Sequence, residues 1–188
     1  MITGGIEMEK LLSKKAEKIS TEAAFILLTV VGAVVLPQIF HALGVLLGVG
    51  GALGQIFLPM YIPVLIIGFY RGPVSGAIAG LFAPIASFLI TNMPSEAILP
   101  FITLELIATG LIAGVFSKSK LPALLRVLLV QVAAKAVRLT AFAISLYVKS
   151  GSVSASALFN GLLTSVPGVI LQLVLLSLLI VKKEKQHE

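Results

Sequence analysis

Six apolar stretches, each close to the length needed to cross a lipid bilayer, constrain this chain more than any other feature of its sequence. They lie at 23–43, 55–70, 73–91, 98–116, 122–148 and 156–181. A membrane-spanning helix needs about 20 predominantly apolar residues, and lipid cannot hydrogen-bond to backbone groups, so each stretch is expected to be helical. The sequence therefore predicts an all-α membrane protein, a bundle of six transmembrane helices.

The composition supports one membrane domain rather than a soluble one. Of 188 residues, 58% are hydrophobic and 12% are charged, and the mean hydropathy is +1.10. We expect an N-terminal segment at 1–22, a transmembrane substrate-binding domain at 23–181 and a basic tail at 182–188. The net charge of +6 is scattered over segment ends rather than gathered on one face, so a nucleic-acid partner is not expected.

The basic residues predict how the chain is oriented. With a cytoplasmic N-terminus, the outer loops carry only Lys149, whereas the inner side carries Lys10, Lys14, Lys15, Lys18, Arg71, Lys118, Lys120, Lys182, Lys183 and Lys185. Positive charge favours the cytoplasmic side. We expect a multi-pass protein of the plasma membrane with both termini in the cytoplasm.

The first 22 residues allow two interpretations. Met8, Leu11, Leu12 and Ile19 fall near one helical face, so residues 8–19 could form a short amphipathic helix on the inner membrane surface. The alternative is a frayed tail. In either case, the stretch 23–43 is expected to be a retained helix rather than a cleaved signal peptide.

Signatures of soluble enzymes are missing from the sequence. There is no phosphate-binding G-x-x-x-x-G-K-[ST] motif, no cysteine and only two histidines, which argues against ATP binding through a P-loop, a metal site and an intramembrane serine protease. We expect neither catalysis nor a cofactor.

Three ionisable residues, Glu105, Lys135 and Arg138, lie inside the apolar stretches. A charge at bilayer depth costs about 2.5–3.5 kcal/mol on insertion scales, so it is usually paired or functional. Lys135 and Arg138 share a helical face, and Gln131 lies one turn before Lys135 on that face. These positions are the best candidates for a site.

Depth along the helices predicts which of these side chains can meet. At 1.5 Å per residue, Glu105 lies ~10 Å, Arg138 ~15 Å and Lys135 ~20 Å below the outer end of its helix. Glu105 and Arg138 are therefore within reach if their helices are neighbours. The last stretch adds Asn160 and Thr164 in its outer half and Gln172 deeper.

Two interpretations of this polar group remain open. It is either a buried ion pair that fixes helix register or a ligand pocket in the outer half of the bundle. One carboxylate cannot neutralise two cations, which favours an anionic or strongly hydrogen-bonding ligand. In the second interpretation Glu105 and Arg138 shape or touch the ligand, and Lys135 with Gln131 and Gln172 closes the pocket floor.

The stretch 42–55 contains five glycines and is too flexible for a rigid helix. On the outer side it could close over a ligand as a lid, and a plain connector is the alternative. The lid candidates are Gly48, Gly50, Gly51 and Gln55.

Small residues recur every four positions in two stretches. Gly76 and Gly80 do so in the third, and Thr29 and Ala33 form a weaker pair in the first. Such faces let helix backbones approach closely. They serve either packing within the bundle or docking of a separate subunit.

Several motifs together resemble the substrate-binding S components of energy-coupling factor (ECF) transporters. The motifs are LPMYIPV at 58–64, Gly68, RGP at 71–73 with Gly76 and Gly80, PIASFL at 84–89 followed by TNMP at 91–94, and Glu105 with Gly110 and Gly114. Length, six spans and the basic tail are also similar, so the resemblance covers most of the chain.

This resemblance implies a membrane protein that captures a vitamin or related micronutrient from outside. Its partners would be a transmembrane coupling subunit and two cytoplasmic ATPases. The ligand would sit toward the outer face, among the first loop and the last three spans. The family's Ala-xxx-Ala contact with the coupling subunit is replaced here by Thr29 and Ala33, a departure from the pattern.

Two other functions fit the same sequence. A stand-alone secondary carrier or channel could use buried Glu, Lys and Arg for proton or anion coupling, although the two halves show no obvious repeat. A structural or assembly protein would use the charges only to hold helices together.

Overall fold

The computed structural model describes residues 2–148 and 155–186, and within these ranges every regular element is an α-helix. The eight helices are α1 (Ile2–Leu46), α2 (Ala52–Phe57), α3 (Tyr61–Arg71), α4 (Pro73–Thr91), α5 (Leu99–Phe116), α6 (Ala123–Tyr147), α7 (Ala155–Thr164) and α8 (Val166–Lys185). Lys149 and most of the gap between the apolar stretches 122–148 and 156–181 lie outside the described residues.

These helices provide the six predicted membrane spans. The candidate spans are Leu11–Leu46, Ala52–Arg71, Pro73–Thr91, Leu99–Phe116, Ala123–Tyr147 and Phe159–Lys185. The all-α fold with six apolar helices long enough to cross a membrane is confirmed.

Two spans that the sequence predicts as single helices are broken. The second divides into α2 and α3 at Leu58, whose backbone is left-handed (φ 48°), and the following Pro59 has no N–H to continue the hydrogen-bond ladder. The last divides into α7 and α8 at Ser165, with Pro167 in the first turn of α8. At the first break the Tyr61 N–H donates to the Leu58 carbonyl, so the Phe57 carbonyl lacks the partner that a continuous helix would give it.

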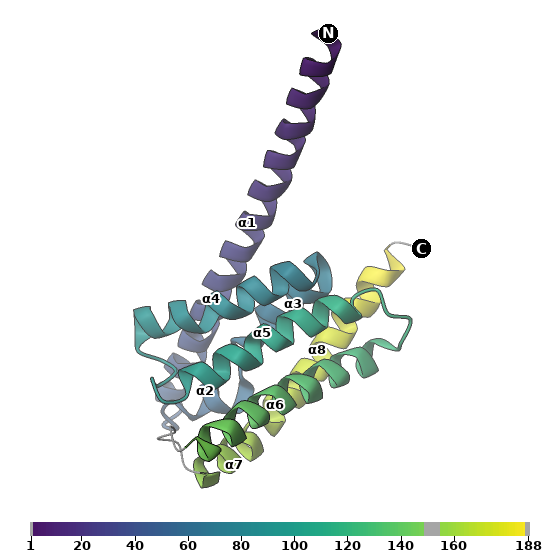
Figure 1. The fold of residues 1–188 in the computed structure, drawn as a ribbon. Helices are drawn as coiled ribbons and strands as arrows, with labels where there is room; N and C mark the ends of the chain where they lie inside the picture. The colour runs from purple at the N-terminus through teal and green to yellow at the C-terminus, as the bar shows by residue number, and fades with distance from the viewer. Residues whose placement is uncertain (1, 149–154, 187–188) are drawn as a thin grey trace.

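Helix α5 lies at the centre of the bundle and packs against α3, α4 and α6 (Figure 1). Its closest seam is with α4, because glycines face each other there. A Cβ on Gly76 would lie 2.2 Å from the carbonyl oxygen of Gly110, and one on Gly80 would lie 2.2 Å from that of Leu106. On the opposite side, α8 packs against α6, α3 and α2.

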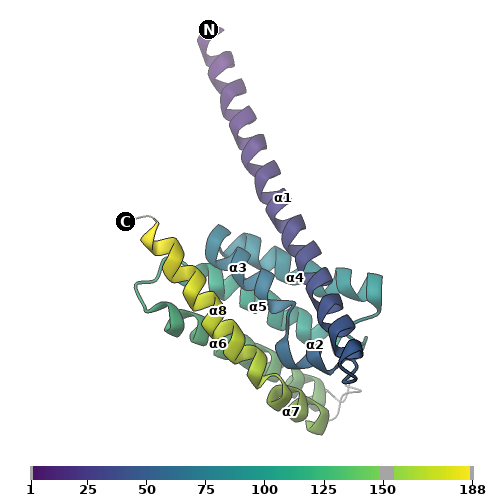
Figure 2. The same cartoon turned by 180° about the vertical axis from the view of Figure 1, so that it is seen from behind.

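The N-terminal half of α1 projects out of the bundle, as both views show (Figures 1 and 2). Met8, Leu11, Leu12 and Ile19 are all exposed there. Residues 8–19 are helical rather than a frayed tail, but they form part of α1, which is continuous from Ile2 to Leu46. No break separates residues 1–22 from the first span.

Candidate functional site

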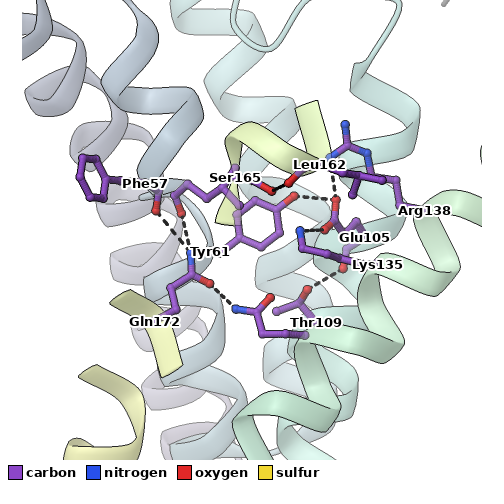
Figure 3. Close-up of polar contacts among 11 residues, drawn as sticks. Phe57, Tyr61, Glu105, Thr109, Lys135, Arg138, Leu162, Ser165 and Gln172 are labelled. Carbon is purple, nitrogen blue, oxygen red and sulfur yellow. Dashed lines mark hydrogen bonds and ion pairs between the residues drawn. The ribbon is translucent and has the colours of Figure 1, made fainter. Parts of the chain in front are cut away.

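The fully buried carboxylate of Glu105, on the central helix α5, is the focus of the site. It accepts three hydrogen bonds, from Tyr61 Oη at 2.7 Å, Lys135 Nζ at 3.1 Å and Arg138 Nη1 at 3.1 Å. Figure 3 shows these side chains converging from α3, α5 and α6. The cluster therefore joins three helices through one acidic group.

Local structure explains why these side chains meet. Lys135 and Arg138 are three residues apart on α6 and so share a face, and α6 packs directly on α5. Tyr61 is the first residue of α3, directly after the break at 58–60. Lys135 Nζ also lies 5.8 Å from the centre of the Tyr61 ring.

The cluster holds more positive charge than negative charge. Glu105 is 0% exposed, whereas the side chains of Lys135 and Arg138 are 19% and 12% exposed. One carboxylate neutralises one of the two cations. In addition, Arg138 Nε is buried and has no hydrogen-bond partner among the described residues. Buried donors without partners are costly, so the site retains capacity for an acceptor.

A layer of amides lies beside the ionic cluster. Gln131 Nε2 donates to Gln172 Oε1, and Gln172 Nε2 donates to the carbonyl oxygens of Leu58 at 3.2 Å and Phe57 at 3.4 Å. These carbonyls belong to the break between α2 and α3, where the Phe57 carbonyl has lost its helical partner and the Leu58 carbonyl also accepts from the Tyr61 N–H, so the amides supply hydrogen bonds at an interruption of the helix. Gln131 Oε1 is buried without a partner among the described residues.

Four of the six predicted binding residues take part in these contacts. Glu105, Lys135 and Arg138 form the ionic cluster, and Gln131 belongs to the amide layer beside it. Asn160 and Thr164 do not join them. Both are exposed on α7, and the Thr164 hydroxyl donates to the Asn160 carbonyl at 2.8 Å. Because the span breaks at Ser165, Asn160 and Thr164 lie on a different helix from Gln172 and do not share its buried face.

The predicted lid is shorter and more ordered than the sequence suggests. Helix α1 continues through Gly44, and only residues 47–51 separate it from α2. Gly48 and Gly50 have positive φ angles of 72° and 59°, which glycine adopts without strain. Gly51 lies against His41, and Gln55 is exposed within α2. The segment 47–51 is thus a tight turn between helices rather than a 14-residue flexible loop.

The predicted docking residues lie mostly inside the bundle. Gly76 and Gly80 pack against α5 backbone, and Ala33 is fully buried. Thr29 is half-buried, and its hydroxyl donates to the Phe25 carbonyl at 2.8 Å. Gly76, Gly80 and Ala33 therefore serve packing within the chain, the first of the two interpretations, and as buried positions they offer little surface to a separate subunit.

Among the buried polar side chains that sequence reasoning missed are those of Tyr61 and Arg126. Tyr61 was part of a motif but was not named as a site residue, although a hydroxyl directly after a proline break in an apolar stretch is a usable signal. Arg126 is 3% exposed and pairs with Glu184. It lies only four residues inside the stretch 122–148, so it looked like an ordinary interfacial charge.

Among the described residues, no group of three or more His, Cys, Asp or Glu side chains could hold a metal ion. What the Glu105 cluster offers instead is a set of fixed hydrogen-bond donors with surplus positive charge. Comparisons of the chain with models of protein families, with curated proteins and with solved structures find no match.

Proposed function

We propose that this protein is the substrate-binding membrane subunit of an ATP-driven importer of the ECF type. It captures a vitamin or related micronutrient at the outer face of the plasma membrane. A transmembrane coupling subunit and two ATPase subunits supply the energy, and both termini of the chain are cytoplasmic. The motifs at 58–94 and around Glu105, together with the distribution of basic residues, support this proposal.

The observation that carries the proposal is the surplus of donors around Glu105. Two cations on α6 share one carboxylate, and Arg138 Nε is a buried donor without a partner among the described residues. A cluster that only fixed helix register would be expected to satisfy its own members. A ligand with an anionic or strongly accepting group would complete this one.

Mass spectrometry of small molecules that remain bound through purification tests the binding role directly. Arg138→Gln removes a charged donor from the cluster, and we expect the amount of retained ligand to fall about tenfold or more, the equivalent of one charge-assisted hydrogen bond. Lys120→Gln is the matched control, since it removes an exposed cation outside the cluster. Equal retention by the two variants would refute the assignment.

A secondary carrier is the alternative, because buried Glu, Lys and Arg side chains suit ion coupling. Uptake of the retained molecule into vesicles separates the two functions. An importer subunit alone binds but does not accumulate substrate, and accumulation requires the ATPase partners and ATP. Accumulation by the purified protein under a proton gradient without ATP would favour the carrier.

A further inference from the structure

A second polar region lies at the end of the bundle that carries the C-terminus, away from the Glu105 cluster. There α3, α5 and α8 end, and α4 and α6 begin; Figures 1 and 2 show the α5–α6 connection beside the end of α8. Two cavities of about 280 and 420 Å³ open in this region and share Phe69, Tyr70, Ser117 and Lys183 as lining residues. Because they share these four residues, the two form one continuous space, which we call the basic cavity.

The basic cavity is strongly positive. Four cations line it, Arg71, Lys118, Arg126 and Lys183, and its lining includes a single carboxylate, Glu184. Arg71 is paired with Glu22 on α1, outside the lining. The remaining three cations face one acid, so the cavity has a surplus of positive charge.

Arg126 is the least expected of these cations. It lies in the first turn of α6, where the helix dipole disfavours positive charge. Its side chain is 3% exposed. Nη2 pairs with Glu184 and Nη1 reaches the Ser117 carbonyl only at 3.5 Å. Nε is buried and has no partner among the described residues. The buried guanidinium therefore keeps hydrogen-bond donor capacity that the half-exposed Glu184 does not use.

Lys183, another lining residue of the cavity, is held in place by its own contacts. Its Nζ donates to the Phe69 carbonyl at 3.3 Å and lies 4.4 Å from the centre of the Tyr70 ring. The Tyr70 hydroxyl is in turn fixed by donation to the Leu179 carbonyl at 3.1 Å. The lysine is therefore positioned before any ligand arrives, which lowers the entropic cost of binding.

We propose that the basic cavity binds a phosphate group. A phosphate oxyanion accepts several charge-assisted hydrogen bonds at once, which suits an arginine and two lysines that line the cavity from α6, α8 and the α5–α6 connection. Phe69 and Ile180 add apolar surface to the lining, which suits the uncharged part of a larger ligand. The phosphate belongs either to an anionic phospholipid headgroup or to a free phosphate compound.

Two probes distinguish these sources on the full-length protein. Native mass spectrometry measures retention of phosphatidic acid against phosphatidylcholine of the same acyl chains. Thermal unfolding in detergent measures stabilisation by inorganic phosphate against chloride at equal ionic strength. Selective lipid retention without a phosphate shift identifies a headgroup, and a phosphate shift without lipid selectivity identifies a free phosphate compound.

A pair of double variants decides whether either signal comes from the cavity. Lys118→Ala with Lys183→Ala removes two lining cations, and we expect the signal to fall about tenfold or more. Lys120→Ala with Lys182→Ala removes the same charge from exposed neighbours outside the lining and is expected to retain the signal. Equal losses in both pairs, or no preference for phosphate in either probe, would overturn the proposal.

Discussion

Two of the ion-pair sites in the described part of the chain differ in which partner is buried. At the first, the carboxylate of Glu105 is 0% exposed and its cations lie nearer the surface. At the second, Arg126 is 3% exposed and its partner Glu184 is 50% exposed. The buried member is thus an anion in one case and a cation in the other.

This reversal decides what each carboxylate does for the fold. Water cannot replace Glu105, so Lys135, Arg138 and Tyr61 depend on it and three helices are joined through it. Water can reach Glu184, so its contribution to stability is expected to be small, and its main effect is on the charge of the basic cavity. The same substitution at the two sites should therefore have very different consequences.

Glu105→Gln should have the largest effect on stability. The amide still accepts a hydrogen bond, but two partly buried cations lose their only carboxylate among the described residues. Breaking a buried ion pair by removing one partner costs about 3–5 kcal/mol. We expect a decrease of that size in the free energy of unfolding, measured by denaturant titration in detergent micelles.

A second variant tests whether unpaired charge is the cause. Adding Lys135→Met to Glu105→Gln removes one of the uncompensated cations and should recover part of the lost stability. If the loss in the free energy of unfolding for the double variant equals the sum of the losses for the two single variants, the two side chains do not interact. Glu105 would then not differ from Glu184 in the way proposed above.

Gly76→Ala should have the next largest effect, because it separates the α4–α5 seam that holds the helix of Glu105. The new Cβ would lie 2.2 Å from the Gly110 carbonyl oxygen, and backbone cannot move aside as a flexible side chain can. Overpacking of this kind costs about 1–3 kcal/mol in the free energy of unfolding.

The matched control is Gly161→Ala in α7, where a Cβ would meet nothing within 4 Å. There the better helix propensity of alanine should leave stability unchanged or raise it by up to about 1 kcal/mol. If both substitutions destabilise the protein equally, the close approach of α4 and α5 is not the reason why alanine is unfavourable at position 76.

The sequence predicted the membrane fold well, because the length and polarity of apolar stretches are set by the bilayer. It also predicted that Glu105 and Arg138 could meet, since their depths depend only on helical rise and direction. Whether they were neighbours depended on packing, which the sequence left open. The contact of α5 with α6 supplies that condition.

The remaining details depend on features that periodicity does not encode. Asn160 and Thr164 were placed in the site by extending one helix across Ser165, where the chain instead starts a new helix. Tyr61 joins the cluster because the break at 58–60 redirects α3. Gly76 and Gly80 form a small-residue face of the kind that suits either packing or docking, and only the positions of Gly110 and Leu106 decide between them.

Glu184→Gln should have the smallest effect on stability and the most informative effect on binding. The carboxylate of Glu184 is 50% exposed and lines an open cavity, so water can take its place beside the Arg126 guanidinium. We therefore expect the free energy of unfolding to change by no more than about 1 kcal/mol. The substitution also removes the carboxylate from the lining of the basic cavity, which leaves Lys118, Arg126 and Lys183 unopposed there. Affinity for the phosphate probe, phosphatidic acid or inorganic phosphate, should therefore rise, because an anionic ligand no longer competes with Glu184 for Arg126.

A fall in that affinity would show that Glu184 positions Arg126 for the ligand rather than competing with it. A large loss of stability would show that the partial exposure of Glu184 does not let water replace its carboxylate. Either result would remove the distinction between the two ion-pair sites.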